Sequence, residues 1–247
     1  MQTQPSSQSP DEHPRVAARS PRPARKAVLI ISLVVIAGFL ALCGLVAVLL
    51  FGPRQFYIPS AGMEPTLMGH TAGGDDHAGG TYSDTVNDYI LVSTGAYRFH
   101  EPRRGDIVVF LAPARADMQN HPPEENILAK RIIGLPGDTI ELKRGKVARG
   151  GHTATAYVAY RNGQPLDEYW DGKPPGYIKE PMDDPQSYAA VYAVDKPLKL
   201  GPNELFVMGN NRNDSNDSRY WGPLERSRII GKVVSILSPR DRQRSFP

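Results

Sequence analysis

The sequence holds a single cysteine and, outside one short segment, no excess of charge of either sign. Cys43 is the only cysteine among 247 residues, so no intramolecular disulfide can form and the fold depends on packing alone. The net charge of +3 arises in residues 1–26, where five basic residues face two acidic ones, and the rest of the chain carries 24 of each sign. No basic stripe follows this segment, which argues against a nucleic-acid partner.

Internal repeats are absent too, and few segments favour a long helix. Glycine and proline contribute 23 residues each, which together make up nearly a fifth of the chain. Both residues interrupt regular structure, so this composition suits many short strands and turns better than a helical bundle. We therefore predict a mostly β fold.

Only one long apolar run is present, and it lies near the N-terminus. Residues 27–51 contain no charged residue, and only Ser32 is polar. At ~1.5 Å per residue this helix would be ~37 Å long, enough to span a bilayer, whereas the apolar part of a cleavable signal peptide has only ~7–15 residues. We predict a disordered basic cytoplasmic tail (1–26), a transmembrane helix (27–51) and an extracytoplasmic domain (52–247), because basic residues stay on the cytoplasmic side.

Seven later segments have the composition of β-strands and are separated by turn-forming residues. They are Tyr89–Thr94, Asp106–Leu111, Ile127–Ile133, Thr139–Lys143, Ala156–Arg161, Glu204–Met208 and Ile229–Leu237. Residues 164–200 have no clear period and are left as an irregular excursion with short strands at most. Residues 68–87 are rich in Gly, Asp, His and Thr and predict a mobile loop. Four of its residues could hold a metal, but a solvated loop is the favoured interpretation: His70, Asp75, Asp76 and His77.

Two segments indicate chemistry. In Ile58–Leu67, Pro59 and Pro65 bracket small residues, which disfavours helix and favours extended or turn backbone. In the strand Ile127–Ile133, alternation places Lys130 on the same face as Leu128 and Ile132. A buried lysine has a lowered pKa and can take a proton near neutral pH, although a lone strand lysine more often reaches out to water.

Four blocks of the sequence together resemble the type I signal peptidases, which are membrane-anchored serine proteases. Ile58–Leu67 resembles their nucleophile segment and Lys130–Asp138 the segment with their general-base lysine. Arg104–Phe110 resembles a structural strand of the family, and Met208–Gly222 resembles the polar loop beside the lysine. The blocks follow the family's order behind an apolar run of the expected kind.

The resemblance assigns roles to individual residues. It makes Lys130 the general base, and it places the Ser60 hydroxyl and the backbone N–H of position 62 in the oxyanion hole. Supporting roles fall to Met63 and Pro65 in the same segment, to Ser215 as hydrogen-bond partner of the lysine amine, and to Asp217 and Arg219 as an ion pair. Two positions depart from the family pattern. Gly62 stands where the nucleophilic serine is expected, and Asn210 replaces an Asp, which we expect to loosen a loop contact.

The missing hydroxyl leaves two main hypotheses. The protein is an active signal peptidase in which Ser60 substitutes as nucleophile, or it is a silent relative that binds signal peptides or modulates an active paralogue. Against the first, residues two apart on an extended strand are ~6.6 Å apart, too far for one lysine to reach both. A third hypothesis, a self-cleaving repressor-type Ser/Lys peptidase, fits poorly because that family is soluble.

The resemblance also implies the fold and the partners. We expect an antiparallel, barrel-like β domain behind one N-terminal helix in the plasma (inner) membrane. The expected partners are signal peptides of exported preproteins, the lipid bilayer and the secretion translocon. The Ser/Lys mechanism implies neither a metal nor an organic cofactor.

Overall fold

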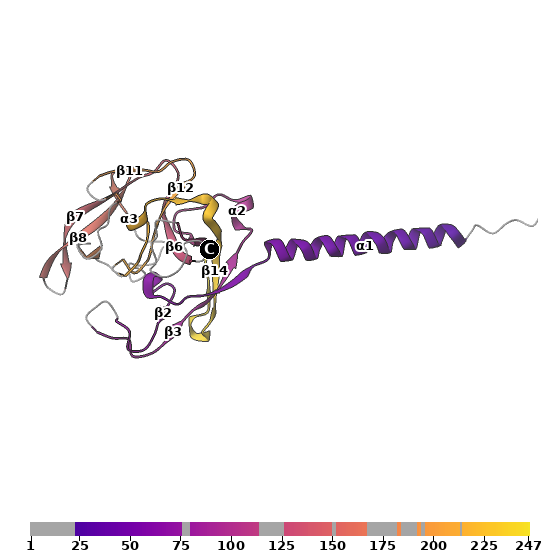
Figure 1. Ribbon diagram of the computed structural model, residues 1–247, viewed down its shortest axis with the longest axis horizontal. Coiled ribbons are helices and arrows are strands. Elements are labelled where there is room, and N and C mark those ends of the chain that lie inside the picture. Colours follow the sequence, from indigo (N-terminus) through magenta and orange to yellow (C-terminus); the bar gives the residue numbers. More distant parts are fainter. Residues whose placement is uncertain are drawn as a thin grey trace, which may run out of the picture. The chain divides into compact units, whose positions relative to one another are not determined.

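The computed structural model describes residues 23–75, 80–113, 126–149, 152–166, 182–183, 192–193, 196–212 and 214–247. The chain divides into two compact units, Met1–Leu50 and Phe51–Pro247, and each is described by itself. Figure 1 shows the helix of the first unit and the strands of the second.

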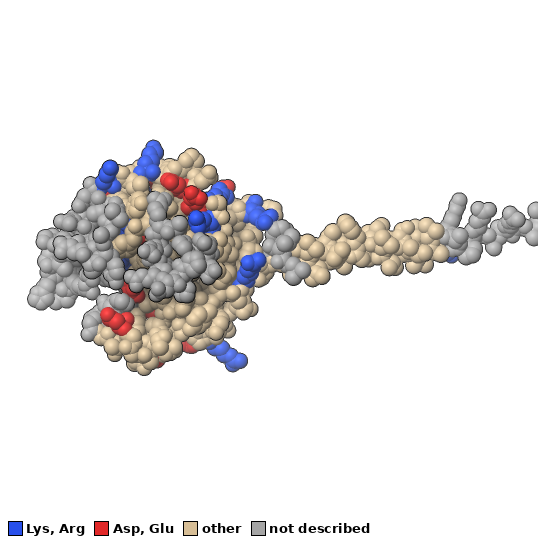
Figure 2. Space-filling model, viewed as in Figure 1, with Lys and Arg blue, Asp and Glu red and all other residues tan. Residues whose placement is uncertain are grey.

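The first unit is dominated by helix α1, Pro23–Phe51. It begins four residues before the predicted start, because Pro23 occupies a first-turn position where its missing N–H costs nothing. Residues 23–26 are therefore helical and not part of a disordered tail, while residues 1–22 lie outside the described residues. Lys26–Val48 is long and apolar enough to cross a membrane, with a mean hydropathy of 2.9. The helix surface in Figure 2 is almost free of charged side chains, as a lipid-facing helix requires.

The main sheet of the second unit is built entirely from antiparallel pairs, which confirms the predicted antiparallel fold. Its order is β1-β4-β14-β5-β6-β12-β13, with β15 paired to β14. The strand bounds are β1 Arg54–Tyr57, β4 Tyr89–Ser93, β5 Ile107–Leu111, β6 Ile127–Gly134, β12 Glu204–Met208, β13 Leu224–Glu225, β14 Ile229–Ser238 and β15 Arg244–Ser245.

A second sheet, ordered β10-β8-β7-β11 with β9 on β8, extends from the main one. Its bounds are β7 Thr139–Arg149, β8 His152–Arg161, β9 Gln164–Pro165, β10 Met182–Asp183 and β11 Leu198–Lys199. Strands β7 and β8 run past the predicted ends because they pair continuously from Ile140–Arg161 to Arg149–His152. The predicted turn after β8 is present, with positive φ at Asn162 (52°) and Gly163 (79°).

The prediction of a mobile loop at 68–87 is wrong for the residues that the structure describes there. Strand β2, Gly69–His70, pairs with β3, Val86–Asn87, and Asp75 forms a bridge with Thr81. The side chain of His70 is buried beneath this ribbon. The described part of this segment forms paired strands although its sequence shows no strand periodicity. Its polar composition was therefore a poor guide to its structure.

Short helices complete the described part of the second unit. They are the 3-10 helix η1 Ala61–Met63, α2 Ala96–Phe99, α3 Ser218–Trp221, η6 Arg226–Arg228 and η7 Arg240–Arg242.

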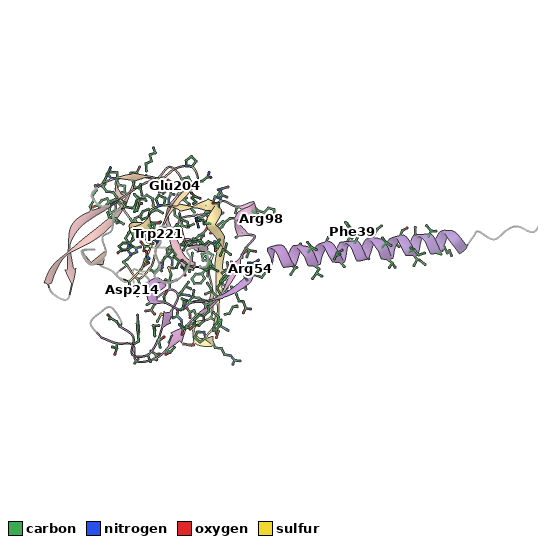
Figure 3. The ribbon with its side chains drawn as sticks, viewed as in Figure 1. Phe39, Arg54, Arg98, Glu204, Asp214 and Trp221 are labelled. Atoms are coloured by element: carbon green, nitrogen blue, oxygen red, sulfur yellow. The ribbon has the colours of Figure 1, made fainter. Side chains whose placement is uncertain are left out.

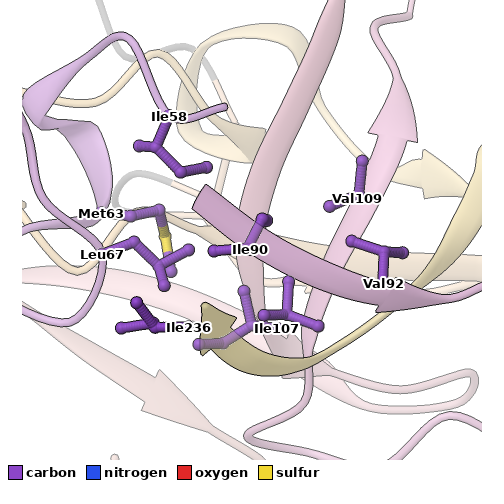
Figure 4. Close-up of a cluster of buried hydrophobic side chains, with 9 residues drawn as sticks. Ile58, Met63, Leu67, Ile90, Val92, Ile107, Val109 and Ile236 are labelled. Carbon is purple, nitrogen blue, oxygen red and sulfur yellow. The ribbon is translucent and has the colours of Figure 1, made fainter. Parts of the chain in front are cut away.

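The main sheet is buried on both faces. Ile107 and Val109 of β5 enter one cluster, shown in Figure 4, together with Met63 of η1 and Leu67, which follows η1. The alternating Val108 and Phe110 enter a cluster on the opposite face with Trp221. The segment Ile58–Leu67, called the nucleophile-like segment below, is thus anchored in the core by its own apolar side chains.

Candidate active site

The segment Ile58–Leu67 is extended at Ser60 and turns at residues 61–63, in agreement with the predicted extended or turn backbone. Ser60 is extended (φ −137°, ψ 153°) and exposed, and it begins η1, in which Ala61, Gly62 and Met63 are buried. The hydrogen bond of this turn runs from the Glu64 N–H to the Ala61 carbonyl, so it does not use the Gly62 N–H. The backbone of Ser60 lies so close to Gly69 that a side chain at position 69 would overlap it. The β2–β3 ribbon therefore fixes the segment from outside.

Lys130 lies in the middle of β6, opposite Val108 of β5. Its side chain is only 5% exposed. Burial lowers the pKa of the Lys130 amine below its ordinary value, although the negative charges of Asp217 and Asp214 act in the opposite direction. The amine lies directly beside Gly62, because a Cβ built on Gly62 would be 3.0 Å from Lys130 Nζ.

The polar loop after β12 packs against this pair from the other side. A Gly62 Cβ would lie 3.2 Å from the carbonyl oxygen of Asp214, the residue labelled in Figure 3, and the Gly62 carbonyl accepts from the Asn211 N–H at 3.2 Å. Gly209 is required at its position, because a side chain there would overlap Ser215 Oγ and the Gly62 carbonyl oxygen. Backbone of the loop thus forms one wall of the site.

An ion pair between Asp217 and Arg219 holds this loop. Arg219 donates through Nε and Nη2 to the two carboxylate oxygens, at 2.8 and 2.9 Å, and the Gly209 N–H donates to Asp217 Oδ2 at 2.9 Å. Arg219 also donates to the carbonyls of Arg212 and Ser215. Burial alone would raise the pKa of Asp217, but the Arg219 charge and these hydrogen bonds keep it below its ordinary value. The loop is fixed by a charged pair from which water is excluded.

Ser215 differs from the expectation that it bonds the lysine amine. Its Oγ is buried without a hydrogen-bond partner among the described residues. The Lys130 amine lies instead close to the position where a Gly62 side chain would begin.

Asn210 makes two side-chain hydrogen bonds. Its Oδ1 accepts from Arg131 Nε at 2.9 Å and its Nδ2 donates to the Thr66 hydroxyl. An amide can do both because it carries an acceptor and a donor. Asn210 therefore ties β6 to the nucleophile-like segment.

A cleft opens beside Lys130, between β1, β4, β5, β6 and the segment before η1. Most of its lining side chains are apolar, while Ser60 and Lys130 contribute a hydroxyl and an amine. The lining consists of Phe56, Tyr57, Ile58, Pro59, Ser60, Met63, Ile90, Val109, Ile127, Leu128, Ala129 and Lys130. A hydroxyl and an amine thus lie along a mostly apolar cleft.

The sequence analysis missed two groups that support the segment. Buried Glu64 accepts from the Tyr82 hydroxyl at 2.8 Å and lies 2.5 Å from His70 Nδ1, and the His70 ring stacks on Tyr82. The position of Glu64 directly after the core residue Met63 could have signalled its burial. Among the residues that the structure describes, no group of three His, Cys, Asp or Glu side chains could hold a metal.

The second group comes from the C-terminal segment. Arg242 donates to both oxygens of buried Asp88, at 2.8 and 2.9 Å, and it reaches the carbonyls of Pro65 and Thr66. Arg244 also donates to the Thr66 carbonyl. No local pattern links residues so far apart in sequence, so only the fold reveals this contact.

Comparisons with known proteins match this sequence along most of its length. The model of the family "Signal peptidase, peptidase S26" matches residues 27–238. A signal peptidase I of Leptolyngbya laminosa is 35% identical over 81% of this chain and 78% of the relative, and one of Mycobacterium tuberculosis (strain H37Rv) is 31% identical over 90% and 76%. A solved signal peptidase I of Enterococcus faecalis V583 is 25% identical, covering 54% of this chain and 97% of that one, with a TM-score of 0.32. Because the family model spans most of the sequence and relatives above 30% identity align along most of their length, the chain belongs to the signal peptidase family, peptidase S26.

Proposed function

We propose that this protein is a membrane-anchored endopeptidase that removes signal peptides from exported preproteins, with Lys130 as its general base. The observation that carries the proposal is the buried amine of Lys130, 3.0 Å from the Cβ position of residue 62 and beside an apolar cleft. A lysine buried in this way is largely neutral at lower pH than a free lysine, as a proton acceptor must be.

The other groups have roles consistent with this chemistry. The Gly62 N–H and the Ser60 hydroxyl would stabilise the oxyanion of a tetrahedral intermediate, a contribution worth roughly 10²–10³ in kcat per donor in serine proteases. Ser60 has a second possible role as the attacking hydroxyl, since it lies in the same cleft lining as Lys130. The Asp217–Arg219 pair, Met63 and Pro65 position the segment and the loop, and Ser215 lies beside the reaction site.

Substrates would lie extended in the cleft, with small side chains before the cleaved bond and main-chain hydrogen bonds to a strand edge. By the positive-inside rule, the basic residues up to Lys26 favour a cytoplasmic N-terminus, with residues 52–247 outside the plasma membrane. The bilayer and the secretion translocon are the partners that this location implies.

Cleavage of a preprotein by the purified full-length chain in proteoliposomes tests the proposal. Wild type should cleave faster than Lys130→Ala, whereas Lys199→Ala, which changes an exposed lysine on β11, should match wild type. Equal inactivity of wild type and Lys130→Ala would contradict the proposed function. Ser60→Ala and Gly62→Ser, measured alongside, separate the two roles of Ser60: cleavage raised in Gly62→Ser with Ser60→Ala unimpaired would exclude Ser60 as nucleophile.

A second function is favoured by Gly62 itself. Loss of the nucleophile in serine proteases costs on the order of 10⁶ in kcat, so the protein would then bind signal peptides without cutting them. Saturable binding of a signal peptide by both wild type and Lys130→Ala, with no cleavage by either, is the result that this alternative predicts.

A further inference from the structure

A pocket with a mainly basic lining lies where residues 103–107 meet β6 and β14. The lining contains one carboxylate, that of Asp106, and four cations: Arg103, Arg104, Arg131 and Lys232. The volume of the pocket is about 180 Å³, several times what one water molecule needs, so a phosphate group fits. The pocket therefore has the charge and the size to take a phosphate anion.

Ion pairs neutralise only part of this positive charge. Lys232 Nζ lies 2.8 Å from Asp106 Oδ1, and Arg104 donates to the two oxygens of Asp138 at 2.8 and 3.0 Å. The side chain of Arg103 is exposed and makes no ion pair within the part of the chain that the structure describes. Two acids thus face four cations, and such an excess of charge raises the local concentration of anions.

Hydrogen bonds connect the pocket to Gly52, the first residue after helix α1. The Gly52 carbonyl accepts from the Thr94 hydroxyl at 3.1 Å. Three residues further along, which span at most ~11 Å, the Tyr97 hydroxyl of α2 donates to Asp106 in the pocket at 2.9 Å. With α1 in a bilayer, Gly52 lies at the membrane surface, and the pocket is within reach of the lipid headgroups.

The end of α2 has the side chains of a membrane-surface segment. Phe99 is 84% exposed, the highest value for a large apolar side chain among the described residues. Arg98 beside it is exposed too, and it lies on the same edge of the second unit as Arg54 in the view of Figure 3. Aromatic rings and cations together are typical of the headgroup region.

We propose that this pocket binds the phosphate of an anionic phospholipid, with Phe99 inserted into the lipid surface beside it. Arg103 and Arg104 would donate to the phosphate oxygens, because a guanidinium group matches phosphate geometry. The inference goes beyond the proposed function, since it concerns how the second unit is held at the membrane and which lipid holds it.

Lipid binding by the full-length chain in detergent micelles tests the proposal. Bound phosphatidylglycerol and phosphatidylcholine are counted by native mass spectrometry, and wild type should prefer phosphatidylglycerol. Arg103→Gln should weaken phosphatidylglycerol binding about fivefold, the effect of one cation at a membrane surface, and Arg103→Glu should weaken it further. Arg240→Gln removes an exposed cation outside the pocket and should match wild type. Thermal melting verifies that each variant is folded.

Two results would overturn the proposal. One is equal binding of the two lipids by wild type, and the other is wild-type affinity for phosphatidylglycerol in Arg103→Glu. Glycerol phosphate separates the lipid from a soluble source of phosphate, and it should not displace phosphatidylglycerol at equal concentration. Displacement at equal concentration would assign the pocket to a soluble phosphate and reject the lipid. None of these measurements depends on cleavage, so an inactive protein would leave them interpretable.

The depth of Phe99 gives a second readout. In a Cys43→Ser background, Phe99→Cys carries a polarity-sensitive fluorophore, and Ser83→Cys, exposed in the second unit, serves as its control. The fluorophore at position 99 should shift to shorter wavelength in phosphatidylglycerol vesicles, and the one at position 83 should not. The same emission at both positions would contradict the insertion of Phe99.

Discussion

At the scale of single residues, the protonation state of Lys130 controls what the site can do. Only the neutral amine accepts a proton, and burial lowers the pKa of Lys130 below the ordinary lysine value of 10.5. Cleavage should therefore rise with pH and level off below that value, since the base is fully neutral above its own pKa.

The same pH profile can be shifted by a neighbouring charge. The carboxylate of Asp214 raises the pKa of Lys130, so Asp214→Asn should move the rising limb to lower pH. Rates of preprotein cleavage by wild type and Asp214→Asn are measured from pH 5 to 10, at saturating and at limiting substrate. They give the pH at which the rate rises in each protein. An unmoved limb would mean that another group limits the reaction.

Asn210 is the residue at which the loop and β6 meet the nucleophile-like segment. Asn210→Ala removes the acceptor of Arg131 Nε and the donor to Thr66, and should lower the free energy of unfolding by about 1–3 kcal/mol. Asn210→Asp should cost less, because a carboxylate accepts from Arg131 and from the Thr66 hydroxyl. Urea unfolding of the detergent-solubilised chain compares them with Asn203→Ala, an exposed turn residue. Equal stability of Asn210→Ala and Asn203→Ala would contradict the assigned role.

At the scale of elements, the turn η7 and strand β15 hold the segment after η1. Arg242→Ala leaves the carboxylate of Asp88 without its charged partner, and this carboxylate is completely buried. The change should therefore lower the free energy of unfolding by about 3–5 kcal/mol. Arg240 lies in the same turn but is exposed, so Arg240→Ala should leave the free energy of unfolding almost unchanged.

A double-mutant cycle separates this contact from general damage. Adding Asp88→Asn to Arg242→Ala removes the uncompensated charge, so the double variant should lose less stability than the two single changes added together. Additive losses, measured by thermal melting, would show that the two side chains do not interact in solution.

Local patterns predicted the bounds of several strands of the main sheet well. Strand β12 matches its predicted range, and β4, β5 and β14 differ by one residue at an end, because alternation and turn residues mark these boundaries. The long extension of β7 and β8 depends on their mutual pairing. His70 of β2 contacts Glu64 and Tyr82, which also bond each other, and these three residues are far apart in the sequence. Such distant contacts leave no local periodicity.

In the candidate site, too, some features follow from local sequence and others depend on distant contacts. The position of Lys130 and the pairing of Asp217 with Arg219 follow from short segments that could be recognised in the sequence. The turn at Ala61–Met63, the partners of Asn210 and the unpaired hydroxyl of Ser215 could not be predicted, because each depends on packing between segments far apart in the chain.

At the scale of the whole molecule, the only thiol reports on the apolar helix. Cys43 lies within the span Lys26–Val48, so a membrane-impermeant maleimide should not label it in intact vesicles but should label it after denaturation in SDS. Labelling of Cys43 in intact vesicles would show that α1 is not embedded.

A second thiol reports on orientation. In a Cys43→Ser background, Ser83→Cys places a thiol at an exposed position of the second unit. With the N-terminus in the cytoplasm, this thiol should react in right-side-out vesicles and stay protected in inverted ones. The opposite pattern would reverse the assigned topology.

The contacts of Arg242 also set an order of events during synthesis. They join it to Asp88 and to the Pro65 carbonyl, across 154 and 177 residues. At roughly 5–20 residues per second, translation delivers Arg242 about 10–35 s after Pro65. During this interval the growing chain already carries Pro65 and Asp88 but lacks the side chain that joins them. This contact therefore cannot form until Arg242 has left the ribosome.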